Sequence, residues 1–142
     1  MEQPDPRYVP LLNAVDFFAF GKLWKIKNRL WKKVDPDFVS KVDEGYHPAI
    51  SLGKKNLTSL YQLVPMLLGS HSLKTGFPLL DFTKSNSSRL GFFKIRPFLF
   101  YACEAVGPNK GIEPNLNKSH LEPLEQSALK DYLRKKGVSF DD

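Results

Sequence analysis

The sequence predicts a mainly β domain, a small barrel of short strands with one C-terminal α-helix packed on it. Two observations lead to this prediction. Short apolar or alternating runs, bounded by Gly, Pro, Asn and Ser residues, recur between residues 21 and 100. A single pattern with helical spacing then follows at residues 123–136, and no internal repeat or heptad run is present.

The size and composition of the chain suggest one globular domain. Its 142 residues are enough for one sizeable core, and 42% of them are hydrophobic and 13% aromatic, which argues against intrinsic disorder. No apolar run approaches the roughly 20 residues of a transmembrane helix. The N-terminus lacks the basic start and cleavage pattern of a signal peptide. We therefore expect a cytoplasmic protein that has no membrane partner.

The single cysteine indicates the state of the thiol, and the net charge indicates the class of partner. Cys103 cannot form an internal disulfide, and its apolar neighbours favour a buried, inert thiol over a reactive one. The net charge is +6. A positive surplus favours a polyanionic partner, of which nucleic acid is the commonest, although it also serves solubility alone.

The chain is expected to divide into an N-terminal segment, one main domain and a short tail. Residues 1–20 form an extended arm followed by a strongly apolar run whose spacing fits a helix or a strand equally. The Phe side chains of this run are expected to plug one end of the core. The barrel and its helix are expected over residues 21–137, and residues 138–142 are a tail.

The clearest predicted strand follows Gly21 and covers residues 22–31. Because strand side chains alternate between faces, one face would carry three cations and an indole, which are Lys25, Lys27, Arg29 and Trp31. Such a face can follow a phosphate backbone while the indole stacks on a base. The solvated face of an antiparallel strand is the alternative interpretation.

Polar and Pro/Gly segments divide the rest of the β region. Residues 32–46 are predicted to form a long surface loop with one helical turn near Phe38, and loops of this length are often functional. Further strands are expected at residues 47–52, 57–68, 77–82 and 90–100, with a connector at residues 107–117. Pro65 predicts a sheet edge or a bulge, because proline lacks the N–H that a central strand donates.

The last predicted element is an amphipathic helix. Pro123 suits its first position, and Gly137 is expected to end it. Its predicted apolar stripe, at three- and four-residue spacing, comprises Leu124, Ala128, Leu129, Tyr132 and Leu133. Basic residues gather towards its end, where they interact favourably with the helix dipole.

Few motifs of known enzyme chemistry are present. The chain has no Walker loop, no dinucleotide-binding glycine motif, no Cys/His metal spacing and no nucleophile elbow, so we expect no metal and no cofactor. The scattered catalytic candidates are His47, His71 and Arg96. Metal-independent RNA cleavage needs a base, an acid and a cation that stabilises the phosphorane, and these side chains can supply all three.

Each candidate also has a simpler interpretation. His47 would only begin the strand before Pro48, and His71 would be an exposed loop residue. Arg96 lies in an apolar strand, where an unpaired guanidinium is costly, so it would need a carboxylate or a ligand.

Four short motifs follow one another along the chain. They are Gly21-Lys22-Leu23-Trp24, Tyr46-His47-Pro48-Ala49-Ile50-Ser51, Val64-Pro65-Met66 with the residues up to Ser70, and Phe92-Phe93-Lys94-Ile95-Arg96-Pro97-Phe98. In this order they resemble the MazF/PemK-like growth-inhibitor family, whose domain also closes with a C-terminal helix. The resemblance spans residues 21–137 and rests on the order of the motifs.

The resemblance implies a small SH3-like barrel of the CcdB/MazF type and, for many members, cutting of single-stranded RNA. Arg96 matches the family's main catalytic cation, and His47 matches an arginine that precedes the proline. The family's hydroxyl residue after Val-Pro falls on leucines here, so Ser70 or Ser72 would substitute for it. The resemblance further implies a homodimer and an antitoxin protein that competes with RNA.

Three functions stay open from the sequence. The first is a toxin-type, metal-independent endoribonuclease that acts on single-stranded RNA. The second is a noncatalytic nucleic-acid-binding barrel. The third is a protein-interaction module that kept the fold and lost the chemistry, with exposed Phe side chains as its partner surface.

Overall fold

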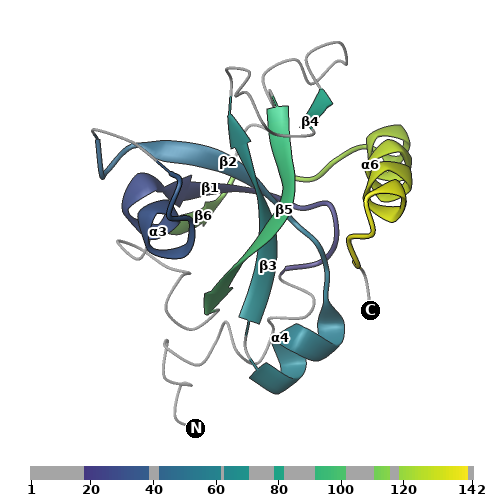
Figure 1. Ribbon diagram of the computed structural model, residues 1–142, viewed down its shortest axis with the longest axis horizontal. Helices are drawn as coiled ribbons and strands as arrows, with labels where there is room; N and C mark the ends of the chain where they lie inside the picture. Colours follow the sequence, from purple (N-terminus) through teal and green to yellow (C-terminus); the bar gives the residue numbers. More distant parts are fainter. Residues whose placement is uncertain are drawn as a thin grey trace, which may run out of the picture.

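The computed structural model describes residues 18–38, 42–61, 63–70, 79–81, 92–101, 111–115 and 119–140. Its six-stranded antiparallel sheet has the order β4-β5-β3-β2-β1-β6 (Figure 1). The strands are β1 (Leu23–Lys27), β2 (Tyr46–Ser51), β3 (Leu63–Ser70), β4 (Leu79–Asp81), β5 (Phe92–Tyr101) and β6 (Ile112–Pro114). The helices are α3 (Asn28–Val34), α4 (Lys55–Tyr61) and α6 (Pro123–Lys135). The predicted arm and most of the apolar run, residues 1–17, lie outside the described residues.

The prediction of a mainly β fold with a C-terminal helix is confirmed. In Figure 1, β3 and β5 run steeply across the direction of β1, so the sheet is strongly twisted. β4 and β6 are its two edges, and no pairing among the described residues joins them into a closed barrel. Strand β6 lies within the predicted connector, where its three residues are too few to show an alternating pattern.

Two segments that we predicted as strands are helical over part of their length. The strand predicted over residues 22–31 is wrong in its second half, because the chain becomes helical at Asn28. The strand predicted over residues 57–68 is wrong in its first half, because α4 continues to Tyr61. Both apolar runs are too short for their periodicity to separate a helix from a strand.

Contacts with the loop before β2 hold the start of α3. The backbone N–H groups of Asn28 and Arg29 donate to the carbonyls of Gly45 and Asp43. The Asn28 side chain donates to the Val42 carbonyl at 2.7 Å. The first turn of a helix leaves such backbone donors without intrahelical partners, and here the distant loop satisfies two of them.

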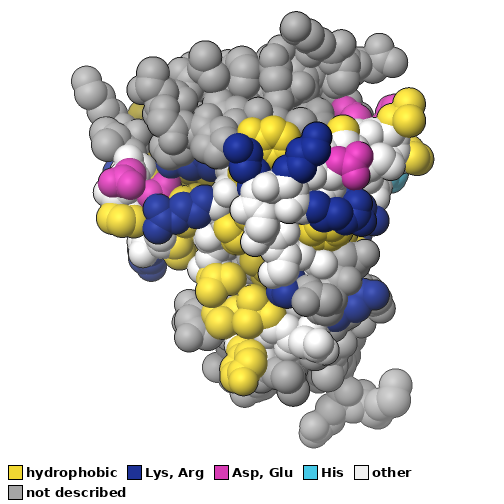
Figure 2. Space-filling model, turned by 45° about the vertical axis from the view of Figure 1, so that its right-hand side comes forward, with side chains coloured by type: hydrophobic (Ala, Val, Ile, Leu, Met, Phe, Trp, Pro, Cys, Tyr) yellow, Lys and Arg dark blue, Asp and Glu magenta, His cyan; other side chains and the backbone are white. Residues whose placement is uncertain are grey.

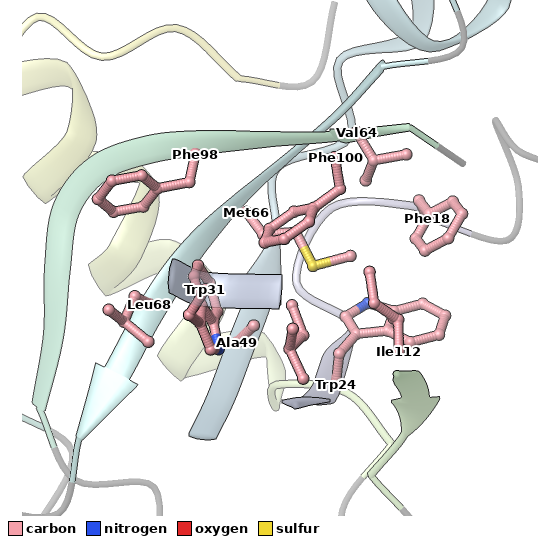
Figure 3. Close-up of a cluster of buried hydrophobic side chains, with 11 residues drawn as sticks. Phe18, Trp24, Trp31, Ala49, Val64, Met66, Leu68, Phe98, Phe100 and Ile112 are labelled. Carbon is pink, nitrogen blue, oxygen red and sulfur yellow. The ribbon is translucent and has the colours of Figure 1, made fainter. Parts of the chain in front are cut away.

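Strand alternation divides the core into two clusters, one on each face of the sheet. The α3 face carries Trp24, Ile26, Ala49, Val64, Met66, Leu68, Phe98, Phe100 and Ile112, and Trp31 of α3 and Phe18 pack against them (Figure 3). The α6 face carries Leu23, Ile50, Leu52, Leu67, Phe93 and Ile95, which Leu121, Leu129 and Leu133 cover. The sheet is therefore a middle layer with a helix on either side.

Pro65 lies inside the sheet, so the edge that we predicted from it is wrong: β3 pairs with both β5 and β2. The Pro65 carbonyl accepts from the backbone N–H of Leu52 at 3.2 Å. The N–H that proline lacks would point to the same side, where pairing with β2 ends at Met66. The irregularity in the pairing of β3 with β5 lies elsewhere, opposite Leu67 to Gly69, where β5 carries the extra residues.

Helix α6 begins and ends as predicted. Pro123 lies in its first turn, after a capping box formed by Glu122 and Glu125. Gly137 has a φ of 71°. The backbone N–H of Val138 donates to the Leu133 carbonyl at 2.9 Å. Together with the bond from the Gly137 N–H to the Arg134 carbonyl, this closes the helix in a Schellman motif.

The apolar stripe of α6 is only partly as predicted. Leu129 and Leu133 are fully buried, but Leu124 is 86% exposed and Ala128 is also exposed. Leu121, just before the helix, is buried instead, and its backbone N–H donates to the Gly21 carbonyl at 2.8 Å. This bond anchors the chain to the sheet before α6 begins, and in the first turn Glu125 is buried while Leu124 faces solvent.

Candidate nucleic-acid interface

Only the first two residues of the predicted basic face lie on a strand. Lys25 and Lys27 lie on β1, whereas Arg29 and Trp31 lie on α3. Trp31 is 0% exposed and packs edge-on against the rings of Phe98 and Phe100. Its predicted role as a stacking surface for an RNA base is therefore wrong, because the buried indole offers no face to a ligand.

Tyr46 on β2 takes the exposed position beside the two lysines. Its backbone pairs with Lys27 in the register of β1 and β2. The ammonium groups of Lys25 and Lys27 lie 5.1 Å and 5.8 Å from the Tyr46 ring centroid. The Tyr46 side chain is 37% exposed. Two cations and an accessible ring thus share one site on the sheet.

Carboxylates surround this site and orient it. Glu44 pairs with Lys27 and lies 3.6 Å from the Arg29 guanidinium, and the hydrogen bond from Lys27 is the main cause that lowers the Glu44 pKa. The Tyr46 hydroxyl donates to Glu113 at 3.2 Å. Desolvation, followed by the charge of Glu113, raises the Tyr46 pKa above its ordinary value. Lys25 pairs with no carboxylate among the described residues.

His47 is half-buried on the α3 face and is held by its neighbours. Its Nδ1 lies 2.6 Å from Asn28 Oδ1, while the Asn28 amide nitrogen donates to the Val42 carbonyl. Because an amide oxygen only accepts, His47 Nδ1 carries the proton in this arrangement. The His47 ring also packs edge-on against Phe38 at 5.2 Å. The strand that begins near His47 is confirmed as β2.

Arg96 is exposed, so the buried guanidinium that we expected is wrong. Its guanidinium lies 5.6 Å from the Phe98 ring centroid. The buried cation of β5 is Lys94, two residues earlier on the same face, and it pairs with the buried Asp35 at 2.9 Å. Arg96 on β5 and His47 on β2 share the α3 face, with β3 between their strands.

Several predicted site residues are not placed by the structure. His71 and Ser72 lie outside the described residues, as does Cys103, which we expected to be a buried, inert thiol. Ser70 ends β3, but its side chain is also outside what is described. The roles predicted for these residues therefore stay predictions.

Sequence reasoning missed two features, one on each face of the sheet. Tyr46 would have been found by applying the alternation argument to β2, because a residue paired with Lys27 shares its face. The Lys94–Asp35 pair joins residues 59 positions apart, and no local pattern indicates it.

Comparison with known protein families, curated proteins and solved structures finds no match to this chain. The resemblance to the MazF/PemK-like family therefore stays a prediction from the order of its motifs. None of the described helices is long and apolar enough to span a bilayer.

Proposed function

We propose that this protein binds single-stranded RNA and that Lys25, Lys27 and Tyr46 form part of the contact. The exposed Tyr46 ring with two ammonium groups beside it carries the proposal. Proteins that bind single strands without sequence preference combine cations that follow the backbone with aromatic rings on which bases stack. The net charge of +6 supports the same class of partner.

The three side chains have different roles in this proposal. Tyr46 replaces Trp31 as the stacking residue, and its hydrogen bond to Glu113 holds the ring in place. Lys25 contacts phosphate, because Glu44 already compensates the charge of Lys27. The proposed contact is sensitive to salt, since binding to phosphates releases counterions.

The stacking role is tested with a fluorescently labelled single-stranded RNA in EDTA, by anisotropy. Loss of one stacked base costs about 1–3 kcal/mol, so Tyr46→Leu is expected to bind roughly 5- to 160-fold more weakly. Tyr46→Phe keeps the ring and loses only the hydrogen bond to Glu113, so it is expected to bind more tightly than Tyr46→Leu. The control is Tyr61→Leu, which removes a Tyr that is 64% exposed on α4. Equal affinities of Tyr46→Leu and Tyr61→Leu would contradict the proposal.

The proposal extends to the finer fold type and to the protein partners. The order of short antiparallel strands followed by one helix supports an SH3-like barrel of the CcdB/MazF type. The resemblance in the sequence supports a homodimer and an antitoxin protein that competes with RNA.

One observation favours a second candidate, metal-independent cleavage of single-stranded RNA at the α3 face, the opposite side of the sheet from Tyr46. With the proton of the neutral ring on Nδ1, facing Asn28, the basic nitrogen of His47 is Nε2. A histidine held in one orientation suits the base that takes the 2′-hydroxyl proton. Arg96 is exposed on the same face of the sheet, where its guanidinium would stabilise the charged phosphorane.

Cleavage is tested by incubating long single-stranded RNA with the protein in EDTA. Discrete fragments are expected from the unmutated protein and from the control Lys33→Ala, which removes an exposed cation of α3, but not from Arg96→Ala or His47→Gln. Intact RNA from the unmutated protein would remove this candidate and leave RNA binding. Intact RNA together with no binding would favour the protein-interaction module.

A further inference from the structure

Cationic and aromatic side chains alternate around the C-terminal half of α6. The Lys130 ammonium lies 5.1 Å from the ring centroid of Phe20, and the Arg134 guanidinium lies 5.4 Å from that of Phe140. The two rings pack against each other, with centroids 5.2 Å apart. Both cations are therefore held over a pair of aromatic rings that comes from opposite ends of the described chain.

The end of the helix continues this arrangement. The Lys136 ammonium lies 5.7 Å from the ring centroid of Tyr132, and Lys135 is exposed beside it. We call Lys130, Arg134, Lys135 and Lys136, with the rings of Phe20, Tyr132 and Phe140, the α6 surface. In Figure 2, which brings the α6 side forward, Lys and Arg side chains gather across the middle of the face.

The α6 surface has a strong positive charge. Residues 130–136 contain four cations and one anion, Asp131, which gives +3. Asp131 pairs with Arg134 at 3.2 Å, and both side chains are more than 60% exposed. Cations at a helix C-terminus interact favourably with the dipole by themselves. That effect, however, does not require an aromatic ring beside the cation, and three of the four cations have one.

The chemistry of the α6 surface fits a polyanion better than a bilayer. A helix that lies on a membrane buries large apolar side chains among the lipids. Among the described residues 128–140, Leu129 and Leu133 face the core, and no large hydrophobic side chain is fully exposed. The exposed Leu124 lies in the first turn, at the other end of the helix.

We propose that the α6 surface is a second contact between the protein and the phosphates of RNA, an inference that rests on the proposed RNA binding. Cations that pack against rings keep fewer rotamers in the free protein, so less side-chain entropy is lost when phosphate binds. Phosphate contacts are independent of sequence. They add affinity whichever bases stack at Tyr46.

The test compares two double variants that remove the same charge from the C-terminal ends of two helices. Lys135→Gln/Lys136→Gln alters the α6 surface, and Lys32→Gln/Lys33→Gln alters α3, on the other face of the sheet. RNA affinity is measured by anisotropy at several salt concentrations, with Tyr46→Leu in parallel. Each lost contact to a single strand lowers the slope of log affinity against log salt by about 0.7. The α6 variant is therefore expected to lose about 1.4 from the slope, and the α3 control is expected to lose nothing.

The outcomes separate this inference from the proposed function. If Tyr46→Leu weakens binding and the two double variants keep the same slope, the α6 inference is overturned and RNA binding at Tyr46 stands. If the α6 variant changes the slope while Tyr46→Leu binds RNA as tightly as the unmutated protein, the inference stands and the site at Tyr46 is wrong. Absence of RNA binding by the unmutated protein overturns both. Binding to phosphatidylserine vesicles that the α6 variant loses, with unchanged RNA affinity, would assign this surface to an anionic membrane instead.

Discussion

Replacing Asp35 with asparagine is expected to destabilise the protein, because it removes the buried carboxylate that pairs with the ammonium group of Lys94. The carboxylate of Asp35 is 1% exposed and the Lys94 side chain is 11% exposed, with 2.9 Å between Oδ2 and Nζ. The pair also ties the C-terminal end of α3 to β5 across the core.

The burial of the pair sets the expected loss in the free energy of unfolding. Removing one partner of a buried pair costs about 3–5 kcal/mol. Lys94 retains some exposure and a flexible side chain, so we expect the lower end, about 3 kcal/mol. Asparagine can still accept the backbone N–H of Asp37, which now donates to Asp35 Oδ1 at 3.0 Å. The substitution therefore tests the charge and leaves this local hydrogen bond in place.

The measurement is urea unfolding followed by tryptophan fluorescence, since both Trp24 and Trp31 are buried in the α3-face cluster. The control is Asp43→Asn, which breaks an ion pair at the surface. In that pair the Lys32 side chain is 37% exposed and the Asp43 side chain is 61% exposed. That change is expected to cost no more than about 1 kcal/mol.

The double variant Asp35→Asn/Lys94→Met removes both charges and is expected to recover most of the lost stability. The reasoning is refuted if Asp35→Asn costs no more than Asp43→Asn. It is also refuted if the double variant is as unstable as Asp35→Asn alone.

Two further predictions concern α6 and the β1–β2 surface. Leu129→Ala is expected to cost about 2–5 kcal/mol, and Leu124→Ala is expected to stay within about 0.5 kcal/mol; equal losses in urea unfolding would contradict the observed helix orientation. The pKa of Glu44 is lowered chiefly by its hydrogen bond with Lys27, so its contribution to stability is present above its ordinary value of 4.5 and is lost as the pH falls through the lowered pKa. Lys27→Met is expected to raise the Glu44 pKa towards 4.5 in an NMR titration, and an unchanged pKa would count against the pair.

Features that depend on neighbouring residues were predicted well from the sequence. The start of α6 at Pro123 and its end at Gly137 follow from backbone preferences that act within a few residues. The strand near His47 and the short strand at Leu79–Asp81 were also identified, because turn residues bound their apolar runs.

Only the tertiary structure decided which side of each element is covered. Alternation shows that Lys94 and Arg96 share a face, but not that α3 ends above Lys94 and leaves Arg96 in solvent. Long-range packing also decides why Trp31 is buried and Tyr46 is exposed. Distant loop carbonyls hold the start of α3, so the chain turns away after Lys27, and the indole enters the core while the phenol stays exposed.

The sequence by itself determined the basic charge, the β-rich pattern and the ends of the last helix, because composition and local preferences do not depend on distant contacts. The choice of accessible cations and rings came from long-range packing, which no local pattern contains.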